Sequence, residues 1–102
     1  MHYTEFEFTL PKGLVDPEGE IHRQGKMRLA TGKDAMFVQR NRRVLEEPDY
    51  GVLVLLSRVI THLGNLSSIS PELLEQLFLV DFAFLQDFFQ RLNGEYVTLG
   101  EL

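Results

Sequence analysis

The longest amphipathic pattern of the chain covers residues 69–94. On a helical wheel at about 100° per residue, its apolar side chains cover about half of the circumference, more than one packing neighbour needs. Ser70 and Pro71 are typical of a helix start, and Gly94 is typical of a helix end. The pattern predicts one continuous helix over 71–92, roughly 33 Å long.

This predicted helix carries a carboxylate, Asp81, near the middle of its apolar arc. The residues expected to lie in the core around it are Leu77, Phe78, Leu85 and Phe88. A buried carboxylate must be paired, hydrogen-bonded or protonated, because its uncompensated burial is costly. We expect Asp81 to be a buried charge of structural role, and a catalytic acid is the alternative. Its candidate partners are a loop amide, Arg23, Arg28 and Arg58.

Alternation of apolar and polar residues predicts two strands near the start of the chain. A strand over 3–10 places its apolar side chains on one face, namely Phe6, Phe8 and Leu10. Residues 11–13, Pro-Lys-Gly, are expected to end this strand, and residues 16–19 have the order of a type I turn. A second strand over 20–30 completes an antiparallel hairpin.

Two further helices are expected between the hairpin and the long helix. Thr31, with Asp34 three residues later, resembles a capping box and predicts a helix over 33–41. Pro48 precedes an apolar stripe that predicts another helix over 48–63.

The expected fold is one α+β domain over residues 1–102. An N-terminal two-stranded antiparallel β-hairpin (1–30) is followed by three α-helices (31–94) and by a tail (95–102) that frays or adds a short strand. With 44% hydrophobic and 25% charged residues, the composition is that of a globular protein. A chain of 102 residues can bury roughly two-thirds of the surface that its unfolded form exposes, enough for a single core.

Charge and cysteine content restrict the function. The net charge of −5 argues against general affinity for nucleic acid or for an anionic membrane. The chain has no cysteine, which excludes a disulfide framework or a thiolate metal site and fits a reducing compartment. The first residues lack the pattern of a signal peptide, and the 71–92 helix carries too many polar groups for a membrane span. We therefore expect a cytoplasmic protein.

Candidate sites for metals or catalysis each have a simpler explanation. Three acidic residues near one turn lack the spacing of a calcium loop: Asp16, Glu18 and Glu20. The histidines lack the spacing of a helical zinc pair: His2, His22 and His62. A basic cluster could contact phosphate, but acidic residues follow it and favour a mixed-charge surface: Arg40, Arg42 and Arg43. We expect no enzyme, no metal and no cofactor.

Four segments carry the most distinctive patterns of the chain. They are TLPKG at 9–13, DPEGEIHRQGKMRLAT at 16–31, LLSRVITHLG at 55–64 and DFAFLQDFFQRLN at 81–93. Together they resemble the small tail assembly chaperones of Mu-like and other contractile-tailed phages, prophages and injection systems. The resemblance covers most of the chain and consists of strand, turn and helix patterns, without a catalytic signature. The segment TLGEL at 98–102 has no counterpart in it.

Membership of this family would imply a chaperone in the cytoplasm of a bacterial host. Such a protein is absent from the virion and binds the tape measure protein, the tail tube protein or both during tail assembly. The wide apolar arc is compatible with this role, because a protein that holds an aggregation-prone client needs apolar surface in a charged body. The expected partner-binding residues lie near the edge of the arc: Leu79, Phe82 and Phe89.

Two other functions stay open at this point. The chain could be a structural component that stays in the assembled tail or injection system. It could also be a small nucleic-acid-binding regulator, since a hairpin with three helices also describes winged-helix-like domains, although its negative charge is unfavourable. The patterns leave the client and the oligomeric state open.

Overall fold

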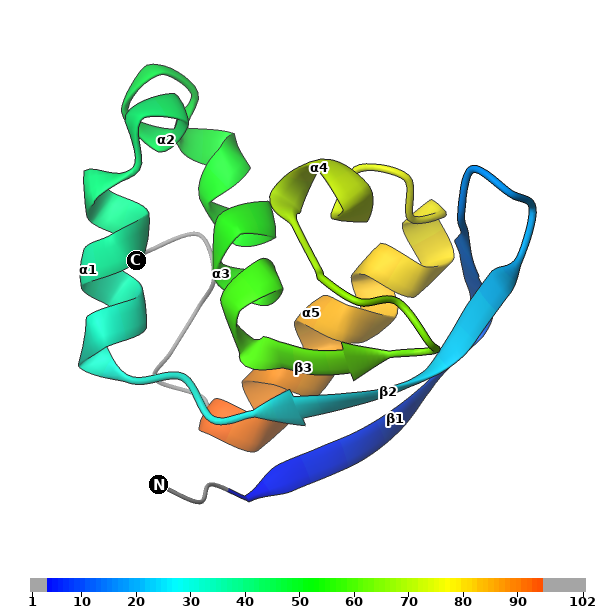
Figure 1. The fold of residues 1–102 in the computed structure, drawn as a ribbon. Helices are drawn as coiled ribbons and strands as arrows, with labels where there is room; N and C mark the ends of the chain where they lie inside the picture. Colours follow the sequence, from blue (N-terminus) through cyan, green and yellow to red (C-terminus); the bar gives the residue numbers. More distant parts are fainter. Residues whose placement is uncertain (1–3, 95–102) are drawn as a thin grey trace.

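A three-stranded antiparallel sheet in the order β1-β2-β3 runs through the molecule (Figure 1). The structure is a computed structural model and describes residues 4–94. The strands are β1 (Glu5–Val15), β2 (Ile21–Arg28) and β3 (Ile60–Leu63). The predicted α+β class and its N-terminal antiparallel hairpin are confirmed, but the third strand was not predicted. The expected tail over 95–102 lies outside the described residues.

β1 is longer than predicted, because the chain bulges at residues 11–13 instead of leaving the sheet. β1 advances from Thr9 to Leu14 while its partner β2 advances by two residues, from 24 to 22. Gly13 makes this bulge possible: its φ is +104°, and a Cβ at this position would lie 2.6 Å from side-chain atoms of β2. The bulge leaves backbone amides free to bind elsewhere.

β3 replaces the end of the predicted 48–63 helix. That segment begins with a short 3-10 helix, η1 (Pro48–Tyr50), and continues as α3 (Gly51–Val59). Ile60–Leu63 then pair with β2. Val59, Ile60 and Thr61 form a run of β-branched residues, which favours a strand. This local preference and the free edge of β2 end the helix earlier than its apolar stripe suggested.

Two helices precede η1 at one end of the sheet. α1 (Gly32–Arg40) confirms the helix predicted over 33–41, whereas α2 (Arg42–Glu46) was not predicted. Asn41 separates the two because its backbone is extended, and its side chain accepts a hydrogen bond from the Val44 amide at 3.1 Å.

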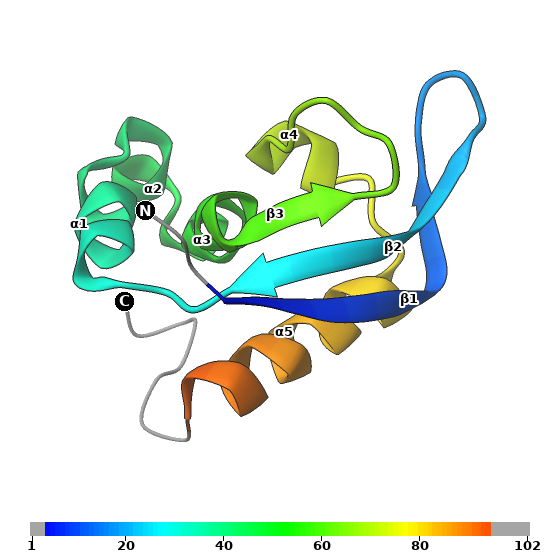
Figure 2. The same cartoon turned by 60° about the horizontal axis from the view of Figure 1, so that its bottom comes forward.

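The predicted continuous helix over 71–92 is wrong, because the chain breaks after its first turn. α4 (Pro71–Leu74) is capped by Ser70 as expected, and α5 (Leu79–Asn93) begins after Phe78, whose backbone is extended. α4 packs against α3, whereas α5 crosses below the sheet and packs against β1 (Figure 2). The apolar residues that formed too wide an arc for one packing neighbour are therefore divided between two helices, which pack against different neighbours.

The core lies between the sheet and the helices on its two sides. Leu85 and Phe89 of α5 are fully buried, and the ring centroid of Phe8 lies 5.5 Å from that of Phe88. Of the expected core residues, Leu85 is confirmed, while Leu77 and Phe88 are half-buried against the core. The prediction that Phe78 lies in the core is wrong: its side chain is 49% exposed, because Phe78 belongs to the break between the two helices.

Candidate protein-interaction surfaces

Asp81 fixes the start of α5 to the bulge of β1. Its side chain is fully buried, and its two oxygens accept hydrogen bonds from the Lys12 amide at 2.8 Å and the Gly13 amide at 3.0 Å. Asp81 also lies in the first turn of α5, where the helix dipole favours a negative charge. Of the partners considered from the sequence, the loop amide is the one that the structure shows.

Three consecutive apolar residues project from the start of α5, and we call Phe78, Leu79 and Val80 the α5 entry patch. Their side chains are 49%, 84% and 45% exposed. The bulge of β1 is bound to Asp81 at the start of α5, and the hairpin continues beyond this bulge. Val15 and Ile21, which pair across the two strands of the hairpin, are two more exposed apolar residues, and Val15 lines a pocket together with Leu73 of α4. Apolar residues that gather at one end of a small protein are typical of a contact surface.

The structure separates the three residues expected to bind a partner. Leu79 is the most exposed large apolar side chain of the described residues, as its place at the edge of the arc suggested. Phe82 is half-buried against the core. The expectation that Phe89 contacts a partner is corrected. Its side chain is fully buried between α5 and the rest of the core, so it cannot offer a free aromatic anchor. The helical wheel placed Phe89 near the edge of the apolar arc because the wheel was drawn for one straight helix that begins at residue 71.

A second buried carboxylate, Asp34, joins β2, α1 and α3. It accepts hydrogen bonds from both terminal nitrogens of Arg28, at 2.8 and 2.9 Å, and from Arg58 Nε at 2.8 Å. The Thr31 amide also donates to it at 2.8 Å, as the predicted capping box requires. Burial alone would raise the pKa of Asp34, but hydrogen bonds from the two guanidinium groups and the amide hold it well below 3.8.

A groove of about 660 Å³ lies beside α1, and we call it the α1 groove. Its lining residues are Lys33, Met36, Phe37, Arg40, Asn41 and Arg58. Met36 and Phe37 form its apolar part and are about half exposed. The guanidinium carbon of Arg58 lies 4.1 Å from the centre of the Phe37 ring, which fixes both side chains at the edge of the groove.

The basic cluster singled out in the sequence divides between two environments. Arg43 lies 3.8 Å over the ring of Tyr50 and is ion-paired with Glu47 and Glu75, which confirms the mixed-charge surface at this point. Burial, together with a hydrogen bond to Glu75, raises the pKa of Tyr50 to about 12. Arg40, by contrast, lines the α1 groove.

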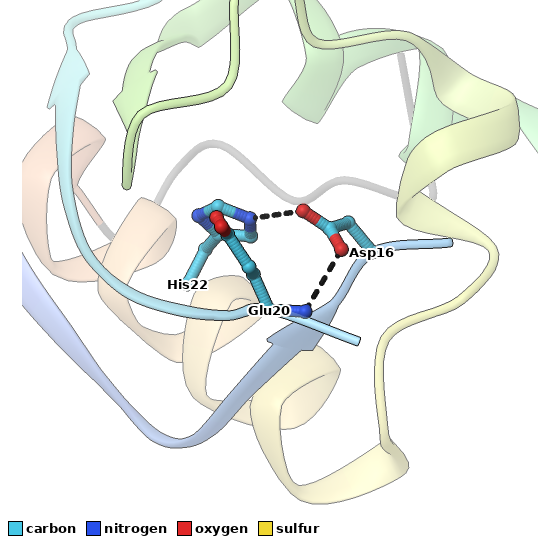
Figure 3. A group of neighbouring side chains, drawn as sticks. All are labelled: Asp16, Glu20 and His22. Carbon is cyan, nitrogen blue, oxygen red and sulfur yellow. Dashed lines mark hydrogen bonds and ion pairs between the residues drawn. The ribbon is translucent and has the colours of Figure 1, made fainter. Parts of the chain in front are cut away.

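Asp16, Glu20 and His22 meet at the end of the hairpin (Figure 3), with ligand atoms within 4.8 Å of one another. Asp16 Oδ1 accepts from the amides of Glu18 and Glu20, and Asp16 Oδ2 lies 2.8 Å from His22 Nε2. The hydrogen bond with His22 lowers the pKa of Asp16. Since both oxygens of Asp16 already bind groups of the chain, the cluster is explained by the folding of the turn.

Comparisons of the chain with family models, with curated proteins and with solved structures found no match. Between residues 4 and 94, no helix is both long and apolar enough to cross a bilayer.

Proposed function

We propose that this chain is a protein-binding assembly factor. More particularly, we propose that it acts in the bacterial cytoplasm as a tail assembly chaperone for the tape measure protein, the tail tube protein or both. The observation that carries the proposal is the α5 entry patch, in which three consecutive apolar side chains remain outside the core. The sequence resemblance supplies the identity of the client.

The anchoring of the patch supports a role in binding. The two hydrogen bonds to Asp81 fix the first turn of α5 on the bulge, so the exposed side chains project from a rigid base. A rigid apolar surface loses little conformational entropy when it binds, which leaves more of the gained free energy for affinity. A client with an apolar helical face could lay that face on the patch. The net charge of −5 opposes self-association through the same surface.

The experiment compares two leucine variants in cells that co-express a tape measure or tail tube protein from the same genome. Leu79→Ser removes the most exposed side chain of the patch. Leu45→Ser is its matched control, because Leu45 is 71% exposed and lies on α2. We expect Leu79→Ser to weaken binding roughly thirtyfold, the effect of losing about 2 kcal/mol at a contact hot spot. The Leu45 variant should copurify with its client as the wild type does.

The amount of client that stays in the supernatant gives the second readout, because a chaperone must prevent aggregation as well as bind. Thermal melting of both variants shows whether they are folded. If folded Leu79→Ser and Leu45→Ser retain the client equally, the α5 entry patch is not its binding surface. If the wild type retains neither client, the proposed chaperone function is wrong.

A further inference from the structure

The α1 groove is separate from the proposed client surface. α1 lies at the opposite end of the molecule from the start of α5 (Figure 1). The groove also differs in charge from the rest of the chain. Its lining contains three cationic residues and no acidic one, although the chain as a whole has a net charge of −5.

We infer that the α1 groove binds an acidic amphipathic helix of a protein partner. Lys33, Phe37 and Arg40 follow one another at i, i+4 and i+7, so they share one face of α1. The cations thus stand near the two ends of this face, with the apolar side chains between them. A partner helix lying along α1 could place its apolar stripe on Met36 and Phe37 and its carboxylates beside the cations.

Two properties of the cations in the groove favour binding of such a partner: one cation has a fixed position, and two form no ion pair with any described residue. Arg58 is held by Asp34 at 2.8 Å and by the Phe37 ring, so it keeps its position without the partner. Among the residues that the structure describes, Lys33 and Arg40 form no ion pair, which leaves their charges available to carboxylates. Opposite charges arranged in this way favour fast association and select against basic partners.

The apolar part of the groove favours a protein over a nucleic acid. A sequence-independent contact with nucleic acid depends on neutralising several phosphates, and the groove offers only a few cations within an acidic chain. Met36 and Phe37 both line the groove, where an aliphatic stripe can cover them.

The probe for this inference is a fluorescein-labelled amphipathic peptide of roughly 16 residues, long enough to form a helix. It carries leucines along one face and glutamates on both sides of that face. Fluorescence anisotropy measures its binding to the full chain. The double variant Lys33→Glu/Arg40→Glu should bind about tenfold more weakly, because it reverses both available charges. Arg42→Glu is the matched control: this exposed arginine lies on α2 outside the groove, and binding should stay within about twofold.

A charge-swapped peptide, with lysine for each glutamate, makes the test reciprocal. It should bind the double variant more tightly than the wild type. Leu79→Ser should bind the acidic peptide as the wild type does, because the α5 entry patch is a different surface. This arm separates the inference from the proposed chaperone function.

Several results would overturn the inference. Equal binding of the acidic peptide by the wild type and by the folded double variant would show that the groove is not its site. Equal binding of a glutamate peptide without leucines, or of single-stranded DNA, would show a general attraction of anions. Much tighter binding by a chain ending at Gly94 would make residues 95–102 of this chain the occupant of the groove.

Discussion

The two ends of the molecule each carry a buried aspartate beside exposed apolar side chains, yet they present different surfaces. The buried carboxylate of Asp81 is compensated by hydrogen bonds from two backbone amides of the bulge and not by a charged side chain of the described residues. Asp34 is neutralised by Arg28 and Arg58, and Arg58 also reaches the α1 groove. The partners that compensate a buried carboxylate therefore help to decide what the neighbouring surface can bind.

The largest effect is expected from Asp34→Asn. The substitution leaves Arg28 and Arg58 without their common anion in a partly buried site, and breaking such a pair costs about 3 kcal/mol of unfolding free energy. Urea denaturation measures the loss. Asp87→Asn is the matched control, because it breaks an exposed pair with Arg91 and should change stability by less than about 0.5 kcal/mol. Equal losses in the two variants would refute the structural importance of Asp34.

A smaller loss of unfolding free energy, about 2 kcal/mol, is expected from Asp81→Asn. The asparagine oxygen can still accept one of the two amides, but its NH2 group faces the other as a second donor. Hydrogen exchange should become faster at the amides of Lys12 and Gly13, which distinguishes a loosened bulge from general unfolding. Unchanged exchange at both amides would contradict the assigned contact.

The pH dependence of stability sharpens the comparison further. The pKa of Asp34 is lower in the folded chain than in the unfolded chain, so its contribution is complete above about pH 5 and is lost as the pH falls through 3.8 and below. The stability difference between wild type and Asp34→Asn should therefore shrink by about 1 kcal/mol between pH 6 and pH 3. Urea denaturation at both pH values measures it, and a difference that grows on acidification would show the opposite sign.

The sequence predicts the local parts of this structure better than the parts that depend on distant contacts. The alternation around Phe8 and the helix start at Ser70 are local patterns, and both agree with the structure. The break before Leu79 depends on Asp81 binding amides almost seventy residues earlier in the chain. No glycine, proline or capping residue marks Phe78 as the break, so the sequence pattern predicted a helix that continues through this residue.

The α1 groove was missed for a similar reason. Its residues come from α1, from Asn41 directly after α1, and from α3, and the sequence does not place α1 and α3 side by side. The basic cluster included Arg40, but no pattern separated it from Arg43, which pairs with acidic side chains. The spacing of Lys33, Phe37 and Arg40 was the one available signal, since it places two cations and an aromatic ring on one helical face.

The smallest effects on stability are expected at the two proposed binding surfaces, the α5 entry patch and the α1 groove. Leu79→Ser and Arg40→Glu alter exposed side chains, so each should change the unfolding free energy by less than about 0.5 kcal/mol. Thermal and urea denaturation check this expectation. A loss above about 1 kcal/mol in either variant would mean that the side chain supports the fold, and its binding data would then need a different control.

Hydrogen exchange of the chain with and without the proposed client, a tape measure or tail tube protein, tests the central claim most directly. We predict slower exchange at the start of α5, over residues 79–85, and at the neighbouring bulge of residues 11–13, with little change along α1. Protection confined to α1, or no protection at the start of α5 in a saturated complex, would contradict the assignment of the client to the α5 entry patch.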